Sequence, residues 1–508
     1  MWHAGYITEI EYSHGYFHEL SPLRLKLAME IAGQRASLPA SPCYLELGFG
    51  QGESLNINAA TNPGSFWGTD FNPAHAATTR DIAAKSGADL IALEASFEEL
   101  AARDDLPEFD IIALHGIWTW ISDRNRAIIV DIARRKLKPG GLFYISYNVT
   151  PGWSPSIPLR HIMKEHSKRA SVGPIPHRMN EAKKFVQSLF DAGSTYFKAN
   201  PGVVDRFNKL KDQNPNYVAH EYLNENWDVM PFSQVADQLS DAKLNFAASA
   251  HLLDAIDEIN LSADAQKLLS QIEDIVLRET TRDYFVNQNF RRDIFVKGQR
   301  PLESFEKNRL LMNQPFMIMM RPEDQPRKVT GSLGEGDLNA SVYEPIFAAL
   351  ASEDYRPKTI SEIIGMPGCE ALSIAQIYQC IVILCGSFRV APAHDEDVFK
   401  AVKPTSKALN DEITRRAVYS DSINFLAAPL IGAGVPTNRF EQLFVRAIDL
   451  DQEDVALWVW TLIRDQGQKL VKDGKPIEAD EDNLNELREK YGEFETKRLP
   501  IFKRLGII

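Results

Sequence analysis

Three glycines alternate with single residues just after a short apolar strand near the start of the chain. Residues 42–52 read P-C-Y-L-E-L-G-F-G-Q-G, and a second predicted strand, 66–70, closes on Asp70, about 20 residues beyond the loop. Glycines let the backbone approach a ligand, and the helix that follows directs its N–H groups at that ligand. Asp70 can accept hydrogen bonds from both ribose hydroxyls of a nucleoside. The spacing therefore predicts a nucleoside-type ligand rather than a tight turn without one.

The positions of the glycines separate two classes of nucleoside ligand. A dinucleotide site requires G-x-G-x-x-G, but Glu53 stands where the last glycine is needed. The observed E-x-G-x-G-x-G instead resembles the S-adenosylmethionine (SAM) loop of class I methyltransferases. That resemblance implies SAM as cofactor, S-adenosylhomocysteine as product, and a binding site made of Glu46, Gly48, Phe49, Gly50, Gly52, Asp70, Phe71, Ser96, Phe97, His115 and Trp118.

Strands and helices alternate beyond the glycine loop. The patterns predict strands at 90–93, 109–115 and 142–147, with helices at 73–86 and 123–137 between them. Strands separated by helices indicate a parallel sheet with helices on both faces, and ligands bind at the carboxyl ends of such strands. We therefore expect His115 and Tyr147 to lie at the same edge as the glycine loop.

The rest of the chain changes character several times. A charged, helical stretch broken by prolines is followed by two more predicted strands, 244–250 and 293–297, and then by a tract rich in proline, glycine and charge. We expect an α/β fold: a Rossmann-like class I methyltransferase sheet with a helical insertion, followed by α+β winged-helix-like C-terminal units. The expected boundaries are 1–152 for the SAM-binding core, 153–227 for the insertion, 228–320 for the end of the sheet, 321–336 for a linker and 337–508 for the C-terminal units.

Composition narrows the class of partner and the compartment. The 508 residues carry a formal net charge of −13, which argues against nucleic acid as the main ligand. The four cysteines form no C-x-x-C pair, so we expect neither a zinc site nor a disulfide framework, and no other metal spacing is present. No apolar run approaches the roughly 20 residues of a membrane span, and no signal peptide is recognisable. These features predict a cytoplasmic protein.

Several short motifs together resemble a bacterial family. The most specific are H-G-I-W-T-W at 115–120 and S-Y-N-V-T-P-G-W at 146–153, joined by H-E-Y-L-N at 220–224, R-D-Y at 282–284 and P-L-I-G-A-G at 429–434. They resemble the class I SAM-dependent methyltransferases with a methyltransferase regulatory domain, which include rickettsial protein lysine methyltransferases. The resemblance covers most of the chain and implies methyl transfer to lysine amines. Phe49 departs from the family pattern, where cysteine or another small residue is common.

Methyl transfer from a sulfonium mainly requires alignment and the exclusion of water. A lysine acceptor, with a reference pKa of about 10.4, must also lose a proton, and burial lowers that pKa. We consider His115, Tyr12 and Tyr147 as catalytic candidates. His115 could act as a general base or as an orienting group, and Tyr12 as part of a lid. Tyr147, with Asn148, loosely resembles the N/D-P-P-Y motif of some N-methyltransferases. Trp120 and Trp153 are expected to be packing anchors.

Three functional hypotheses remain open at this point. The first is a protein lysine methyltransferase, in which the insertion and C-terminal units form a substrate cleft or a homodimer surface. The second transfers the methyl group to oxygen or nitrogen of a glycan or small metabolite. The third is a regulatory protein that binds SAM without catalysis, and the intact glycines and Asp70 argue against it. The pair His220–Glu221 is expected to make a structural hydrogen bond between insertion and core.

Overall fold

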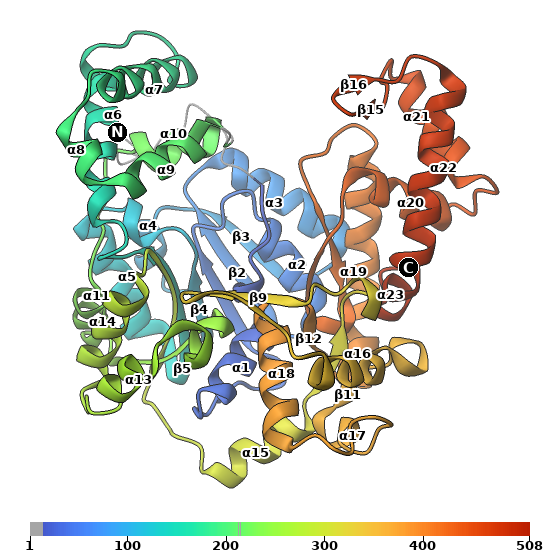
Figure 1. Ribbon diagram of the computed structural model, residues 1–508, viewed down its shortest axis with the longest axis horizontal. Helices are drawn as coiled ribbons and strands as arrows, with labels where there is room; N and C mark the ends of the chain where they lie inside the picture. Colours follow the sequence, from blue (N-terminus) through green and yellow to red (C-terminus); the bar gives the residue numbers. More distant parts are fainter. Residues whose placement is uncertain (1–13, 212, 214) are drawn as a thin grey trace.

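The computed structural model describes residues 14–211, 213 and 215–508, so the predicted lid residue Tyr12 lies outside the described residues. A seven-stranded sheet in the order β3-β2-β1-β4-β5-β7-β6 forms its centre (Figure 1). Its strands are β1 (Cys43–Leu47), β2 (Ser65–Asp70), β3 (Leu90–Glu94), β4 (Phe109–Leu114), β5 (Leu137–Asn148), β6 (Leu244–Ser249) and β7 (Phe290–Lys297). The first five are parallel, and β7 runs antiparallel to both of its neighbours. The predicted Rossmann-like sheet is confirmed.

Helices cover both faces of this sheet, as the apolar strands require. Successive residues of β1 and β4 enter opposite cores: Tyr44 and Ile111 belong to one, Leu45 and Ile112 to the other. The first face is covered by α1 (Pro22–Ile31), α2 (Glu53–Thr61) and α3 (Pro73–Ser86). The second is covered by α4 (Phe97–Ala101), α5 (Asp123–Lys136) and α11 (Phe232–Ser240).

The predicted helical insertion follows β5. It contains α6 (Ile157–Arg169), α7 (Ile175–Asp191), α8 (Thr195–Ala199), α9 (Pro201–Lys211) and α10 (Pro215–Leu223), which share a hydrophobic core of their own. Asn148, at the end of β5, donates from Nδ2 to Glu221 Oε1 of α10 at 3.0 Å. Arg160 of α6 donates to the carbonyl oxygens of Glu221 and Asn224. Glu221 therefore makes the hydrogen bond between insertion and core that the sequence suggested.

Four short helices lie between the last two strands of the sheet: η4 (Leu252–Ala255), α12 (Asp257–Asn260), α13 (Ala263–Leu269) and α14 (Ile275–Val286). Beyond β7, α15 (Ser304–Asn313) carries the chain away from the sheet to β8 (Pro315–Ile318), which pairs with β11 (Lys358–Thr359) and β12 (Val390–Pro392). The tract expected to be a linker contains η5 (Pro322–Asp324) and most of a hairpin, β9 (Lys328–Gly331) with β10 (Gly334–Asp337).

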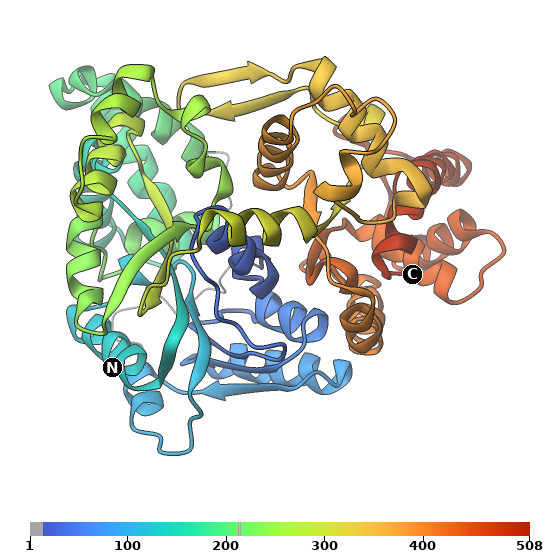
Figure 2. The same ribbon diagram turned by 90° about the horizontal axis from the view of Figure 1, so that it is seen from below.

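The C-terminal region is mostly helical. Its elements are α16 (Ala340–Tyr355), α17 (Ile360–Ile363), α18 (Ile374–Gly386), α19 (Glu396–Ala417), β13 (Phe425–Ala428), η6 (Pro429–Ile431), β14 (Ala433–Pro436), α20 (Arg439–Asp449), α21 (Val455–Asp465), β15 (Val471–Lys472), β16 (Lys475–Pro476), α22 (Asp480–Lys497) and α23 (Leu499–Leu505). It lies on the opposite side of the sheet from the insertion in both views (Figures 1 and 2). Thr405 and Ser406 of α19 donate to the carbonyl oxygen of Ala60, which joins this region to α2.

Candidate active site

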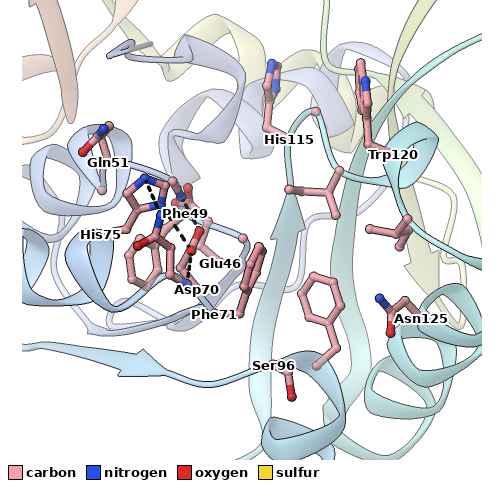
Figure 3. A pocket seen from close by; sticks show the side chains of 18 of the residues that line it. Glu46, Phe49, Gln51, Asp70, Phe71, His75, Ser96, His115, Trp120 and Asn125 are labelled. Carbon is pink, nitrogen blue, oxygen red and sulfur yellow. Dashed lines mark hydrogen bonds and ion pairs between the residues drawn. The ribbon is translucent and has the colours of Figure 1, made fainter. Parts of the chain in front are cut away.

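A cavity of about 410 Å³ opens at the carboxyl ends of the central parallel strands (Figure 3). The glycine loop after β1, the tip of β2, the turn after β3 and the turn after β4 meet there, because parallel strands end at one edge of a sheet. The predicted residues that line it are Glu46, Gly48, Phe49, Gly50, Gly52, Asp70, Phe71, Ser96, Phe97 and His115.

The glycine loop has a backbone that other residues adopt with strain. Gly48, Gly50 and Gly52 have φ angles of 73°, 58° and 73°, in the left-handed region. A Cβ on Gly52 would lie 2.0 Å from Thr79 Oγ1, and one on Gly48 would lie 2.5 Å from Ile117 Cδ1. Gly52 is also the N-cap of α2, so the free N–H groups of that helix open beside the cavity. The loop is thus a backbone cradle for a ligand.

Asp70 is held in place by its own neighbours. Its Oδ2 accepts from the backbone N–H of Gly50 at 2.9 Å, and its Oδ1 accepts from that of Asn72 at 2.9 Å. The Nδ1 atom of His75 lies 3.3 Å from Oδ1 (Figure 3). A carboxylate has about four acceptor directions. The two backbone N–H groups use two of them and His75 can use a third, so at least one direction stays open to a ribose hydroxyl.

Glu46 brings a second acid to the cavity in a drier setting. It is 4 % exposed, and Tyr44 Oη donates to its Oε2 at 3.4 Å. Burial raises the pKa of Glu46 to about 8, the Tyr44 hydrogen bond lowers it, and the charge of Asp70 raises it further. Because a nearby cation favours the ionised form, this acid suits a ligand with a positively charged end.

His115 lies between two aromatic rings at the end of β4. The ring of Phe17 stacks on it with centroids 3.8 Å apart, and its Nδ1 is 2.8 Å from Tyr144 Oη. Burial lowers the pKa of His115 to about 4. The imidazole is therefore neutral at physiological pH and a weak proton acceptor. A lowered pKa is more typical of an orienting group than of a general base, and both roles stay predictions.

The segment before α1 joins the cavity to the C-terminal region. Gly15 and Phe17 line the cavity, and the N–H of Phe17 donates to Ser54 Oγ of α2 at 3.0 Å. Tyr16, between them, packs instead against the ring of Phe425 in β13, with centroids 5.4 Å apart. Alternate residues of this segment thus contact the ligand cavity and the C-terminal region.

Two predicted site residues lie elsewhere, and this corrects their sequence-based placement. Trp118 is 1 % exposed and packs in the core under α5, outside the lining of the cavity. Tyr147 is fully buried and donates to Asp293 Oδ2 at 2.7 Å, because β5 turns it to the face opposite Ser146. Trp120, expected to be a packing anchor, lines the cavity instead, whereas Trp153 packs in the core of the insertion.

Sequence reasoning missed several residues that line the same cavity. They are Gly15, Phe17, Gln51, Glu53, Ser54, Asn72, His75, Ala95, Glu98, Gly116, Ile117, Trp120, Ile121, Ser122, Arg124, Asn125, His220 and Asn226. A local signal exists for His75, which lies in the first turn of α3, five residues after Asp70. No local signal exists for His220 and Asn226, because the insertion brings them to the cavity from far along the chain.

Comparison with known proteins identifies the family of this chain. The family model described as a methyltransferase domain matches residues 45–141, and that described as a predicted methyltransferase regulatory domain matches residues 214–297. An uncharacterized protein of Synechocystis is 39 % identical over 100 % of this chain and 99 % of its own length. The chain belongs to the SAM-dependent methyltransferases that carry this regulatory domain. An uncharacterized Rickettsia prowazekii protein is 25 % identical over 56 % of this chain and 51 % of its own length.

Solved structures show the same fold for the methyltransferase. PKMT2 from Rickettsia typhi, in complex with AdoHcy, has a TM-score of 0.72 and 17 % identity, covering 98 % of this chain and 99 % of its own. The cofactor of the methyltransferase is SAM, and the residues present fit it: a glycine cradle that a Cβ would fill, a fixed acid for the ribose and a buried acid for the cationic end. Within the described part of the chain, no helix has the length and apolar character needed to cross a membrane.

Proposed function

We propose that this methyltransferase transfers the methyl group of SAM to the side-chain amine of lysine in a protein. The observation that carries the proposal is the presence of aromatic and apolar side chains in the cavity together with a buried His115. Phe17, Trp120 and Ile121 line the cavity, and His115 itself is neutral because burial lowers its pKa to about 4. Such surroundings disfavour a charged ammonium, so a lysine amine loses its proton on entry without a strong base.

The insertion supports a macromolecular acceptor. His220 and Asn226 of this separate helical layer line the cavity together with the turn after β4, so we expect the insertion to contact the acceptor. The resemblance of the sequence motifs to rickettsial protein lysine methyltransferases supports the same acceptor class. The alternative of a glycan or a small metabolite would favour polar groups where Trp120 and Ile121 stand.

The residues of this chain act mainly by positioning. SAM supplies an activated methyl group on a positively charged sulfur. The glycine loop and Asp70 hold the nucleoside, Glu46 balances charge at the end of β1, and Phe17 and His115 exclude water from the reacting end. Alignment of amine and methyl group in one line then accounts for most of the barrier reduction that the protein provides.

The acceptor is tested by incubating the full chain with SAM labelled in its methyl group and with fractionated cell extract. Gly50→Asp serves as the inactive control, because it places a side chain on a left-handed residue and a carboxylate against Asp70. We expect label in protein, stable to mild base and recovered as methylated lysine, with the wild type only. Label confined to small molecules or polysaccharide would instead support the alternative, and equal labelling by Gly50→Asp would contradict both.

A further inference from the structure

A second cavity of about 600 Å³ lies along β6, the last strand of the sheet, and is closed by α12, α13 and α14. None of its lining residues lines the SAM cavity. Most of them fall within residues 214–297, the part that matches the regulatory-domain model. Eight of its 24 lining residues are charged, and acids outnumber bases: Asp254, Asp257, Glu279, Asp283 and Asp293 against Arg278, Arg282 and Arg291.

Arg291 is the centre of this charge cluster. Its guanidinium, 5 % exposed, donates to Glu279 at 3.0 Å, to Asp283 Oδ1 at 2.6 Å and to Asp293 Oδ2 at 2.8 Å. Tyr147 of β5 donates a further hydrogen bond to Asp293. One guanidinium thus faces three carboxyl groups, which leaves the cluster short of positive charge.

One carboxylate oxygen of Asp283 lacks a hydrogen-bond donor. The residue is 2 % exposed and lines the cavity, and its Oδ1 is satisfied by Arg291. Its Oδ2 accepts no hydrogen bond from any residue that the structure describes. A buried carboxylate oxygen without a donor is unfavourable, and each such group in a native fold requires an explanation. A ligand that donates to Oδ2 provides one.

The chemistry of the walls selects the kind of donor. Within the described residues, no group of three or more His, Cys, Asp or Glu has an arrangement that could hold a metal ion. The Arg291 guanidinium already occupies the space between the carboxyl groups. Side-chain amides and hydroxyls, from Gln266, Gln288 and Ser249 among others, complete the lining and supply further acceptors. A volume in the range of about 300–1,000 Å³ is typical of sites for small molecules.

We propose that this second cavity binds a small aliphatic amine, whose ammonium group donates to Asp283 Oδ2. The site is separate from the methyl-transfer cavity, and it does not depend on which acceptor the enzyme methylates. The segment that matches the regulatory-domain model would then bind a ligand different from SAM and from the methyl acceptor.

Binding of an amine here should release a proton near neutral pH. Burial raises the pKa of Asp283 to about 7, and Arg291 lowers it. The groups around it are Arg291 and Asp293 from β7, Glu279, Arg278 and Arg282 from α14, and Asp254 and Asp257 from η4 and α12. Since the amine needs the ionised form, its affinity should rise as the pH rises through about 7.

Calorimetry tests the proposal with 1,5-diaminopentane, titrated into the full chain at pH 8 with saturating S-adenosylhomocysteine. We expect saturable binding, weakened about tenfold or more by Asp283→Asn. The matched control is Asp264→Asn, an exposed acid of α13 outside the cavity, which should leave the affinity unchanged. No binding up to about 10 mM, or equal binding by wild type and Asp283→Asn, would overturn the proposal.

A second variant and a second readout guard against a folding defect. Glu279→Gln changes a partly accessible acid of the same cluster and should lower the affinity for 1,5-diaminopentane severalfold. For the wild type at pH 7, the binding heat should differ between buffers of unlike ionisation enthalpy, since a proton is released. Heat that does not depend on the buffer would contradict the role of Asp283. Binding of S-adenosylhomocysteine in the same samples separates this result from the assignment of the SAM cavity.

Discussion

Gly52 and Gly87 form a matched pair for testing the glycine cradle. Both have left-handed backbones, with φ angles of 73° and 68°, and both cap α-helices. A Cβ on Gly87 would meet nothing within 4 Å, whereas one on Gly52 would lie 2.0 Å from Thr79 Oγ1, 2.8 Å from its Cγ2 and 2.9 Å from its Cβ. Alanine at the two positions therefore meets the same left-handed backbone, whereas the steric clash arises only at Gly52.

The structure gives the size of that difference. Left-handed backbone should cost Gly87→Ala about 1 kcal/mol in the free energy of unfolding. Gly52→Ala should add about 1–3 kcal/mol for overpacking, since Thr79 is fully buried in α3 and its Cβ cannot rotate away. We expect Gly52→Ala to lower the free energy of unfolding by about 2–4 kcal/mol in total. It should also lower the affinity for S-adenosylhomocysteine, because the clash moves α2 away from α3 beside the cavity.

Urea unfolding followed by tryptophan fluorescence measures the first effect, and calorimetric titration measures the second. Thr79→Ala in the Gly52→Ala background removes two of the three clashing atoms and should restore part of the loss, so the pair should be non-additive. Equal stability of Gly52→Ala and Gly87→Ala would refute the reasoning, and so would strictly additive effects of Gly52→Ala and Thr79→Ala.

Two further predictions concern residues whose surroundings the structure revealed. Tyr147→Phe removes a buried hydrogen bond to Asp293, so it should lower the free energy of unfolding by about 1–2 kcal/mol. It should leave methyl transfer within about twofold, and a hundredfold loss of kcat would restore Tyr147 as a catalytic residue. Burial raises the pKa of Glu46 to about 8 in the folded chain, against 4.5 for an ordinary glutamate. Between these two pH values the folded state holds a proton that the unfolded state has lost. The free energy of unfolding of the ligand-free protein therefore falls as the pH rises from about 5 to 8. Glu46→Gln cannot ionise, so it should be more stable than the wild type at pH 8, by an amount on the order of several kcal/mol, and should differ little from it at pH 5. Urea unfolding midpoints of both proteins at the two pH values measure the difference. A stability difference that does not change with pH would contradict the raised pKa of Glu46.

The features that the sequence predicted correctly depend on the spacing of residues within short stretches of the chain. The alternation of apolar strands and helices predicts the sheet, and the interval from the glycine loop to Asp70 brings two adjacent strand ends together. His115 followed from the end of a strand alone. Its neutral state did not, because that depends on Phe17 and Tyr144, which enclose it from distant parts of the chain.

The misplaced residues share a different physical cause. Trp118 and Trp120 lie in the short 3-10 helix η2 (Trp118–Trp120), where the sequence does not tell which ring turns toward the cavity and which toward the core. Tyr147 is one residue beyond Ser146 on a strand buried on both faces, so hydrophobicity gives no clue to its side. The pairing of β8 with β11 and β12 joins segments that are far apart in sequence.

The central claim is that SAM occupies the cavity at the carboxyl edge of the sheet and depends on Asp70. The most direct measurement is calorimetric titration of S-adenosylhomocysteine into the wild type, Asp70→Asn and Glu94→Gln. Glu94 pairs with Asp70 in register on β3, but it is exposed and lies outside the cavity lining, so its variant makes the same charge change one strand away. We predict that Asp70→Asn weakens binding at least tenfold while Glu94→Gln binds as the wild type does. Unchanged binding by Asp70→Asn would place the cofactor elsewhere.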